Sequence, residues 1–150
     1  MPTISCDCGH AKVDISGKPL MRMICHCTLC QEFYKAPAGD PAVFKAADVS
    51  VQDENTVNYR RLRKPPAVDR GVCAQCEQPI VEFFPMPLLP DIVFVPGDRL
   101  AGHPDLFTDP ELRIFYHSRT EDATDDIPRY EGYWPSQLAI VHRLLPALLR

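Results

Sequence analysis

Seven cysteines, gathered in three short groups, are the residues of this sequence whose types and spacing could do chemistry. The groups are Cys6 and Cys8, then Cys25, Cys27 and Cys30, and finally Cys73 and Cys76. Spacings of one or two residues let two thiolates from one turn reach a single ion, with Zn–S distances of about 2.3 Å. No cysteine stands alone, so the groups predict metal binding.

Counting ligands divides the cysteines into two zinc sites. A closed tetrahedral site needs four ligands, and two pairs from distant segments can supply them, whereas three ligands leave an exchangeable position that is typical of catalytic zinc. We therefore predict two Zn²⁺ per chain. The closed structural site would be made by Cys6, Cys8, Cys73 and Cys76, and the open site by Cys25, Cys27 and Cys30.

Several alternatives remain open from the sequence. All seven thiolates could share one two-zinc cluster, the groups could pair differently, or the thiols could form disulfides or hold an iron–sulfur cluster. Both metals could also be structural, with a histidine as the fourth ligand of the open site. The candidates for that ligand are His26, His103, His117 and His142. His26 lies between two cysteines of an extended segment, so its side chain should point away from theirs.

The elements that position these groups are predicted to be short strands. Sixteen prolines in 150 residues disfavour long helices, and 45% hydrophobic residues suit a single globular domain. Short β-type runs bounded by Gly, Pro and Asp indicate a mostly-β domain. They are found at residues 12–15, 20–24, 42–44, 49–52, 57–59, 80–84, 92–95 and 112–116.

Two helices are expected beside these strands. A short one covers residues 28–35 and carries Cys30. The second covers 136–145, with an apolar stripe at Leu138, Val141 and Leu145, and we expect Pro146 to end or kink it. The stripe either packs on the domain or forms a contact between two copies of the chain, a homodimer.

Composition also limits partners and location. The net charge of −4 disfavours a nucleic-acid binder, and no apolar run is long enough for a membrane helix. No signal-peptide pattern opens the sequence, so the expected location is cytoplasmic, where clustered thiols usually bind metal.

The one dense basic run is 60–64, which either receives an anion or is a solvated turn. Tyr130, Tyr133 and Trp134 are read as core or lid residues rather than ligand contacts.

The three cysteine groups, with Arg70 before the last of them, resemble the glutathione-dependent formaldehyde-activating enzyme family, also called the centromere-protein-V-like domain. The resemblance covers roughly residues 3–133. It implies a β-tent of small antiparallel sheets built around zinc knuckles. It also implies the same division into structural and catalytic cysteines. We expect a zinc domain over 1–135 and a C-terminal helical extension over 136–150 that packs on the same domain.

The resemblance further implies a carbon–sulfur lyase. Its reaction joins a small thiol, glutathione, and an aldehyde, formaldehyde, reversibly into S-(hydroxymethyl)glutathione. Two positions depart from the family pattern: Glu77 stands where a glycine is usual, and Arg113 where a histidine is frequent. The alternative to the lyase is a binding module whose zinc ions only build the domain.

Overall fold

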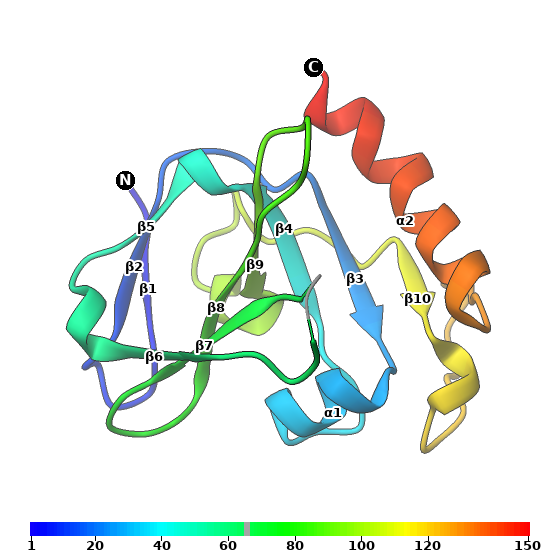
Figure 1. Cartoon of the computed structure of the whole chain (residues 1–150), viewed down its shortest axis with the longest axis horizontal. Coiled ribbons are helices and arrows are strands. Elements are labelled where there is room, and N and C mark those ends of the chain that lie inside the picture. Colours follow the sequence, from blue (N-terminus) through cyan, green and yellow to red (C-terminus); the bar gives the residue numbers. More distant parts are fainter. Residues whose placement is uncertain (65–66) are drawn as a thin grey trace.

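The computed structural model describes residues 1–64 and 67–150, which form ten strands and two α-helices (Figure 1). The strands are β1 (Thr3–Ser5), β2 (Lys12–Ile15), β3 (Met21–Cys25), β4 (Pro41–Lys45), β5 (Val49–Val51), β6 (Val57–Arg60), β7 (Asp69–Cys73), β8 (Pro79–Phe84), β9 (Ile92–Pro96) and β10 (Leu112–Ile114). The helices are α1 (Thr28–Tyr34) and α2 (Tyr133–Leu148). The expected mostly-β fold, with a helix after the second cysteine group and another at the C-terminus, is confirmed.

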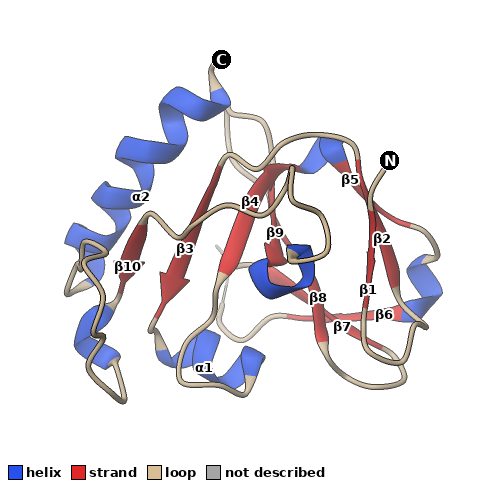
Figure 2. Cartoon of the chain, turned by 180° about the vertical axis from the view of Figure 1, so that it is seen from behind, coloured by secondary structure: helices blue, strands red, loops and turns tan. Residues whose placement is uncertain are grey.

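The strands form two sheets. A three-stranded sheet has the order β1-β2-β5, and a seven-stranded sheet has the order β10-β3-β4-β9-β8-β7-β6. Each pairing is antiparallel except that of β10 with β3, which makes the larger sheet mixed. Figure 2 shows α2 lying along the β10–β3 side, at the opposite end of the molecule from the small sheet.

Alternating side chains of the larger sheet separate two hydrophobic clusters. On β4, Ala42 and Phe44 belong to the cluster shared with the small sheet, whereas Val43 belongs to the cluster shared with α2. This is the period of two expected when both faces of a strand are covered. Each cluster contains cysteines of one predicted site: Cys6 and Cys73 in the first, and the second cysteine group in the other.

The strand predictions differ from the structure in three places. β1 and β7 were not expected, because three residues give too short a pattern and the Asp69–Cys73 segment mixes charges with glycine. The strand expected over 112–116 ends at Ile114, because Phe115 adopts a left-handed conformation (φ 52°) that breaks the extended backbone. A 3₁₀ turn, Tyr116–Ser118, follows it.

Helix α2 is longer than predicted at both ends. It begins at Tyr133, so Pro135 lies in the first turn, where its missing N–H has no partner to lose. Of the two outcomes expected at Pro146, an end or a kink, the end is contradicted, because the helix continues to Leu148. Pro146 lies in the last turn, where the burial of Ala147 and Leu148 favours two further residues. Among the described residues, no helix is long and apolar enough to cross a membrane.

Candidate metal centres

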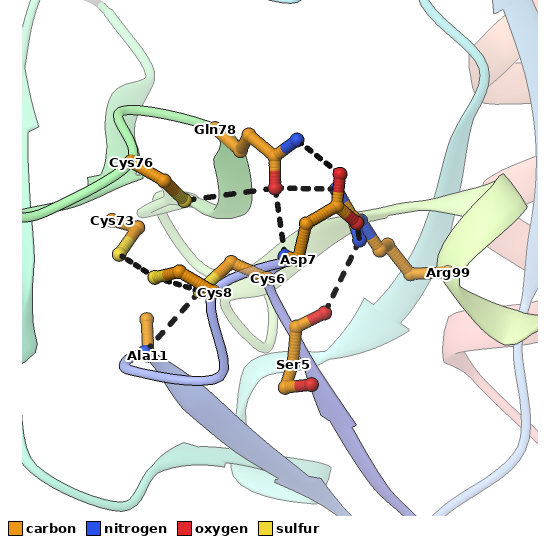
Figure 3. Close-up of polar contacts among 9 residues, drawn as sticks. All are labelled: Ser5, Cys6, Asp7, Cys8, Ala11, Cys73, Cys76, Gln78 and Arg99. Atoms are coloured by element: carbon orange, nitrogen blue, oxygen red, sulfur yellow. Dashed lines mark hydrogen bonds and ion pairs between the residues drawn. The ribbon is translucent and has the colours of Figure 1, made fainter.

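The four cysteines of the predicted closed site meet where the β1–β2 loop approaches the β7–β8 turn (Figure 3). Their sulfur atoms all lie within 4.8 Å of one another. The Sγ of Cys8 lies 3.4 Å from that of Cys6 and 3.7 Å from that of Cys73. Tetrahedral zinc with Zn–S bonds of about 2.3 Å requires sulfur–sulfur distances of about 3.8 Å, so these residues fit the ion.

Backbone geometry aims N–H groups at the buried sulfurs of this site. The N–H of Ala11 donates to Cys6 Sγ and the N–H of Gln75 donates to Cys73 Sγ, both at 3.4 Å. Both cysteines are nearly inaccessible to solvent. Amide donors stabilise the thiolate form of a cysteine, which is the form that binds a metal. The two hydrogen bonds therefore favour metal binding at Cys6 and Cys73.

Three polar side chains brace the closed site from outside the sulfur cluster, as Figure 3 shows. Gln78 accepts from the N–H of Asp7 at 2.8 Å and from Arg99 at 2.9 Å. Arg99 also donates to the carboxylate of Asp7, and Cys76 Sγ lies 3.6 Å from the Gln78 oxygen. The first of these hydrogen bonds joins the two cysteine loops directly, so it positions the ligands of both.

Glu77, which stands where the family usually has glycine, adopts the backbone conformation that a glycine would have. Its φ is +60°, the left-handed conformation that a glycine adopts without strain. The N–H of Glu77 still donates to the carbonyl of Cys73, at 2.9 Å. The turn is therefore formed with a glutamate in place of glycine, at a steric expense of about 1–2 kcal/mol.

The predicted open site lies at the junction of β3 and α1. Cys25 ends β3, Cys27 is the N-cap of α1, and Cys30 lies in its first turn. Cys25 donates to Cys27 at 3.3 Å, and the N–H of Cys30 donates to the same sulfur at 3.3 Å. Hydrogen bonds from Cys25 and Cys30 hold the pKa of the Cys27 thiol well below its usual range. Cys27 is half-buried, whereas the other two are buried.

A buried arginine lies beside the open site. Arg70 Nη1 is 3.9 Å from Cys30 Sγ and 2.8 Å from a carboxylate oxygen of Glu82, and the ring of Phe33 lies 5.4 Å from its guanidinium carbon. Burial works against the charge of Arg70, but attraction to Glu82 and Cys30 outweighs it and raises the pKa of the guanidinium. The cysteine group is therefore paired with a permanent positive charge.

The carboxylate of Glu82 completes this buried chain. It accepts from the hydroxyl of Tyr34 at 3.0 Å, through the carboxylate oxygen that does not contact Arg70. Burial raises the pKa of Glu82 to about 7, while Arg70 and the Tyr34 hydroxyl oppose the shift. The carboxyl thus depends on the guanidinium for its charge near neutral pH.

His26 is not a ligand of the open site in this arrangement. Its Nε2 lies 3.0 Å from Nη1 of Arg113, and because arginine only donates, this nitrogen must accept. The imidazole is buried against Tyr116, with ring centres 5.1 Å apart. Over the described ranges 1–64 and 67–150, the candidate metal clusters contain cysteines only, so neither His26 nor His103, His117 and His142 joins them.

A cavity of about 250 Å³ opens beside His26. Arg113 lines it and is held by the carboxylate of Asp125, from the loop after Tyr116–Ser118. Arg113 therefore places a cation at a position where the family frequently has histidine.

The basic run begins next to the open site. Arg60, the last residue of β6, is directly opposite Arg70 in the antiparallel register, so the two side chains leave the same face. Both Arg60 and Arg61 are exposed, and Arg61 forms a salt bridge with Asp69, with 2.6 Å between Nε and Oδ1.

Several residues around these sites could not be recognised from the sequence. Among them are Gln78, Glu82, Arg99 and Tyr34. Glu82 alone had a signal, because a charged residue inside an apolar strand must find a partner when it is buried. Of the three aromatic residues expected in the core or a lid, Tyr130 packs against the cluster beside α2, whereas Tyr133 and Trp134 are 48% and 70% exposed and do not lie in the core.

Replacing Arg70 with methionine should lower the free energy of unfolding by about 3–5 kcal/mol, because Glu82 would be left buried without its partner. Arg61→Met is the matched control, since it removes an arginine–carboxylate pair that is exposed and should change stability by less than about 1 kcal/mol. Urea denaturation of both variants measures the difference. Equal, small losses would contradict the role assigned to the buried pair.

Comparisons with known proteins agree with this geometry. The family model of the glutathione-dependent formaldehyde-activating enzyme matches residues 1–118, a range that contains all seven cysteines. The chain is also similar to a Rhodobacter sphaeroides protein of known crystal structure, with 16% identity and a TM-score of 0.54, over 73% of this chain and 98% of that one. At that identity the likeness supports the fold alone. A comparison with curated proteins gave no match. Because the family model spans most of the chain, the protein belongs to the glutathione-dependent formaldehyde-activating enzyme family.

Proposed function

We propose that this protein is a zinc-dependent carbon–sulfur lyase that joins glutathione and formaldehyde. The observation that carries the proposal is the three-cysteine cluster, which has no fourth protein ligand among the described residues and lies beside a buried arginine. We assign the structural role to Cys6, Cys8, Cys73 and Cys76, and the catalytic role to Cys25, Cys27 and Cys30.

The reaction requires a thiolate and a carbonyl carbon. The thiol sulfur forms a bond to the carbon of formaldehyde, the C=O π electrons move to oxygen, and the thiol proton ends on that oxygen. A free thiol has a pKa near 8.5, so little of it is thiolate at neutral pH. Zinc held by the three cysteines would supply the positive charge that favours the thiolate form of a small thiol at neutral pH.

The residues of the chain prepare this site electrostatically. Three thiolates carry a charge of −3, which exceeds the charge of one Zn²⁺, and Arg70 lies where it balances the excess. Glu82 and Tyr34 hold the guanidinium in place through the hydrogen bonds described above. Arg70 is therefore proposed as a positioning residue that keeps the cysteine cluster compact and charged.

The proposed reaction is tested by exchange NMR with ¹³C-formaldehyde and glutathione. Purified protein with both zinc ions should speed the approach to the adduct without changing the equilibrium position. Removing the more weakly held zinc with a chelator should abolish the acceleration, and adding zinc back should restore it. No acceleration with this pair, on protein shown by metal analysis to carry two zinc ions, would overturn the lyase and favour the binding module.

Glutathione is an anion at neutral pH, and we propose that Arg60 receives one of its carboxylates. Arg60 is exposed and leaves the sheet on the same face as Arg70. Arg60→Glu should raise the KM for glutathione about tenfold, with a smaller effect on kcat. Arg61→Glu is the control, because Asp69 already engages that side chain. Steady-state kinetics that give equal KM values for both variants and the parent would mean that the basic run is a solvated turn.

A further inference from the structure

The outer side of α2 carries a continuous apolar stripe that nothing in the chain covers among the described residues. Trp134 is 70% exposed, Leu138 65%, Val141 50%, Leu145 36% and Leu149 68%. Their spacing of three or four residues places them on one side of the helix. The sequence left open whether this stripe packs on the domain or meets another copy, and the structure turns it outward.

The inner side of the same helix is apolar too. Ala139, Leu144 and Leu148 belong to the cluster shared with β3 and β10. A helix that is apolar on both sides is normally buried on both sides. Figures 1 and 2 show one side of α2 against the sheet and the other away from the molecule. The outward stripe is therefore the expected place for a partner.

We propose that a second copy of this chain covers the stripe, with the two α2 helices packed antiparallel about a two-fold axis beside Val141. In this arrangement Leu138 of each copy lies opposite Leu145 of the other, and Trp134 lies opposite Leu149. The stripe is thus complementary to itself, as a two-fold interface requires. A shallow groove of about 570 Å³ runs beside it and is lined partly by Tyr130 and Pro135, so side chains of the second copy have room to insert.

The exposed area is sufficient for such a pair. Aromatic side chains bury about 150–250 Å² each, so Tyr133, Trp134 and the four aliphatic residues together present roughly 600 Å² at these exposures. Two copies facing each other would bury roughly 1,200 Å² before neighbouring residues are counted, which reaches the range of specific interfaces.

Charge favours a protein copy over a lipid surface. Helix α2 contains no acidic residue, and its one arginine, Arg143, turns inward to donate to Ala139 and Tyr130. An amphipathic helix that binds bilayers usually has a polar face rich in Lys and Arg, and a chain of net charge −4 is repelled by anionic lipid. No charge interrupts the stripe, so two copies can meet along its whole length.

The single tryptophan of the chain lies in the proposed interface and provides a direct readout. Sedimentation equilibrium of the zinc-loaded chain should show a dimer at micromolar concentration that dissociates on dilution. The emission of Trp134 should shift to longer wavelength over the same concentration range, because dissociation returns the indole to water. The proposal would be overturned by a chain that stays monomeric, with unchanged emission, at about 100 times a micromolar dissociation constant.

A charged substitution in the stripe tests the geometry separately. Leu138→Glu should raise the dissociation constant about 100-fold or more, because two carboxylates would be desolvated in each dimer. Ala47→Glu adds the same charge at an exposed 3₁₀ turn, Ala46–Asp48, and should leave the dimer intact. Both variants should keep two zinc ions, and Ala47→Glu should keep the parent melting temperature, whereas Leu138→Glu should melt like the parent diluted to its monomeric range. A dimer that survives Leu138→Glu unchanged would overturn the proposed pairing.

Discussion

Replacing Cys73 with serine should leave the protein largely unfolded at 25 °C, with the zinc of the four-cysteine site lost. Cys73 is fully buried and its sulfur lies 3.7 Å from that of Cys8. The substitution would therefore replace one of the four thiolates of the site with a hydroxyl, which is a poor zinc ligand. Zinc binding to such sites contributes about 10–16 kcal/mol of folding free energy in zinc-finger peptides. A whole domain is usually stable by only about 5–15 kcal/mol, so the loss is comparable to the total.

Circular dichroism melting and zinc analysis of the soluble fraction measure this effect. Val72→Ala is a suitable control, because it truncates the neighbouring, half-buried residue of β7 and leaves all four ligands in place. It should lower stability by an ordinary amount, about 1–2 kcal/mol, and keep both ions. A Cys73→Ser protein that melts like the parent and carries two zinc ions would show that this cluster does not hold a structural metal.

The second large effect is expected at Cys27. Cys27→Ser should remove activity by at least about a thousandfold while leaving the fold intact, because the cluster at the start of α1 would be reduced to two thiolates. The serine hydroxyl can still accept from the N–H of Cys30, so the N-cap of α1 is retained. One zinc ion should remain per chain, in the four-cysteine site.

Cobalt substitution separates this prediction from a general loss of structure. Co²⁺ bound by thiolates absorbs in the visible and near-ultraviolet, so the two sites can be titrated in turn. In Cys27→Ser the spectrum of the four-cysteine site should persist and the second set of bands should be lost. If Cys27→Ser and Cys73→Ser collapse equally, both clusters are structural and the binding module is the better description.

The two cysteine clusters could be predicted from the sequence because their information is local. A pair of thiolates with one or two residues between them identifies a knuckle without any knowledge of the fold, and counting ligands then divides the cysteines between two sites. The strands were found for a similar reason. The alternation of Lys12, Val13, Asp14 and Ile15, for example, is visible within four residues and becomes β2.

The support of the open site could not be predicted, because it depends on register. Arg70 and Glu82 are 12 residues apart, on β7 and β8, and face each other only through the pairing of those strands. The sequence of β7 has no strand pattern, so its pairing register with β8 could not be predicted either. The same applies to α2, which is apolar on both sides, so its sequence does not say which side faces the sheet.

The two cysteine clusters differ in how far apart their residues lie along the chain. During synthesis, one cluster can therefore form earlier than the other. Cys25, Cys27 and Cys30 fall within six residues, so even the denatured chain can bring them to one ion. Cys8 and Cys73 are 65 residues apart. At a synthesis rate of about 5–20 residues per second, the N-terminal pair waits several seconds for the turn that completes its site.

A growing chain would therefore present the proposed three-cysteine site before it has a fold, and would gain the proposed long-range zinc crosslink late. An ion that binds both the denatured and the native chain stabilises the native state by less than its affinity suggests. An ion that requires the folded chain contributes its whole binding free energy to folding. Under the proposed roles, the ion at the three-cysteine site would act on chemistry and hardly on folding, whereas the ion at the four-cysteine site would fold the chain and take no part in the reaction.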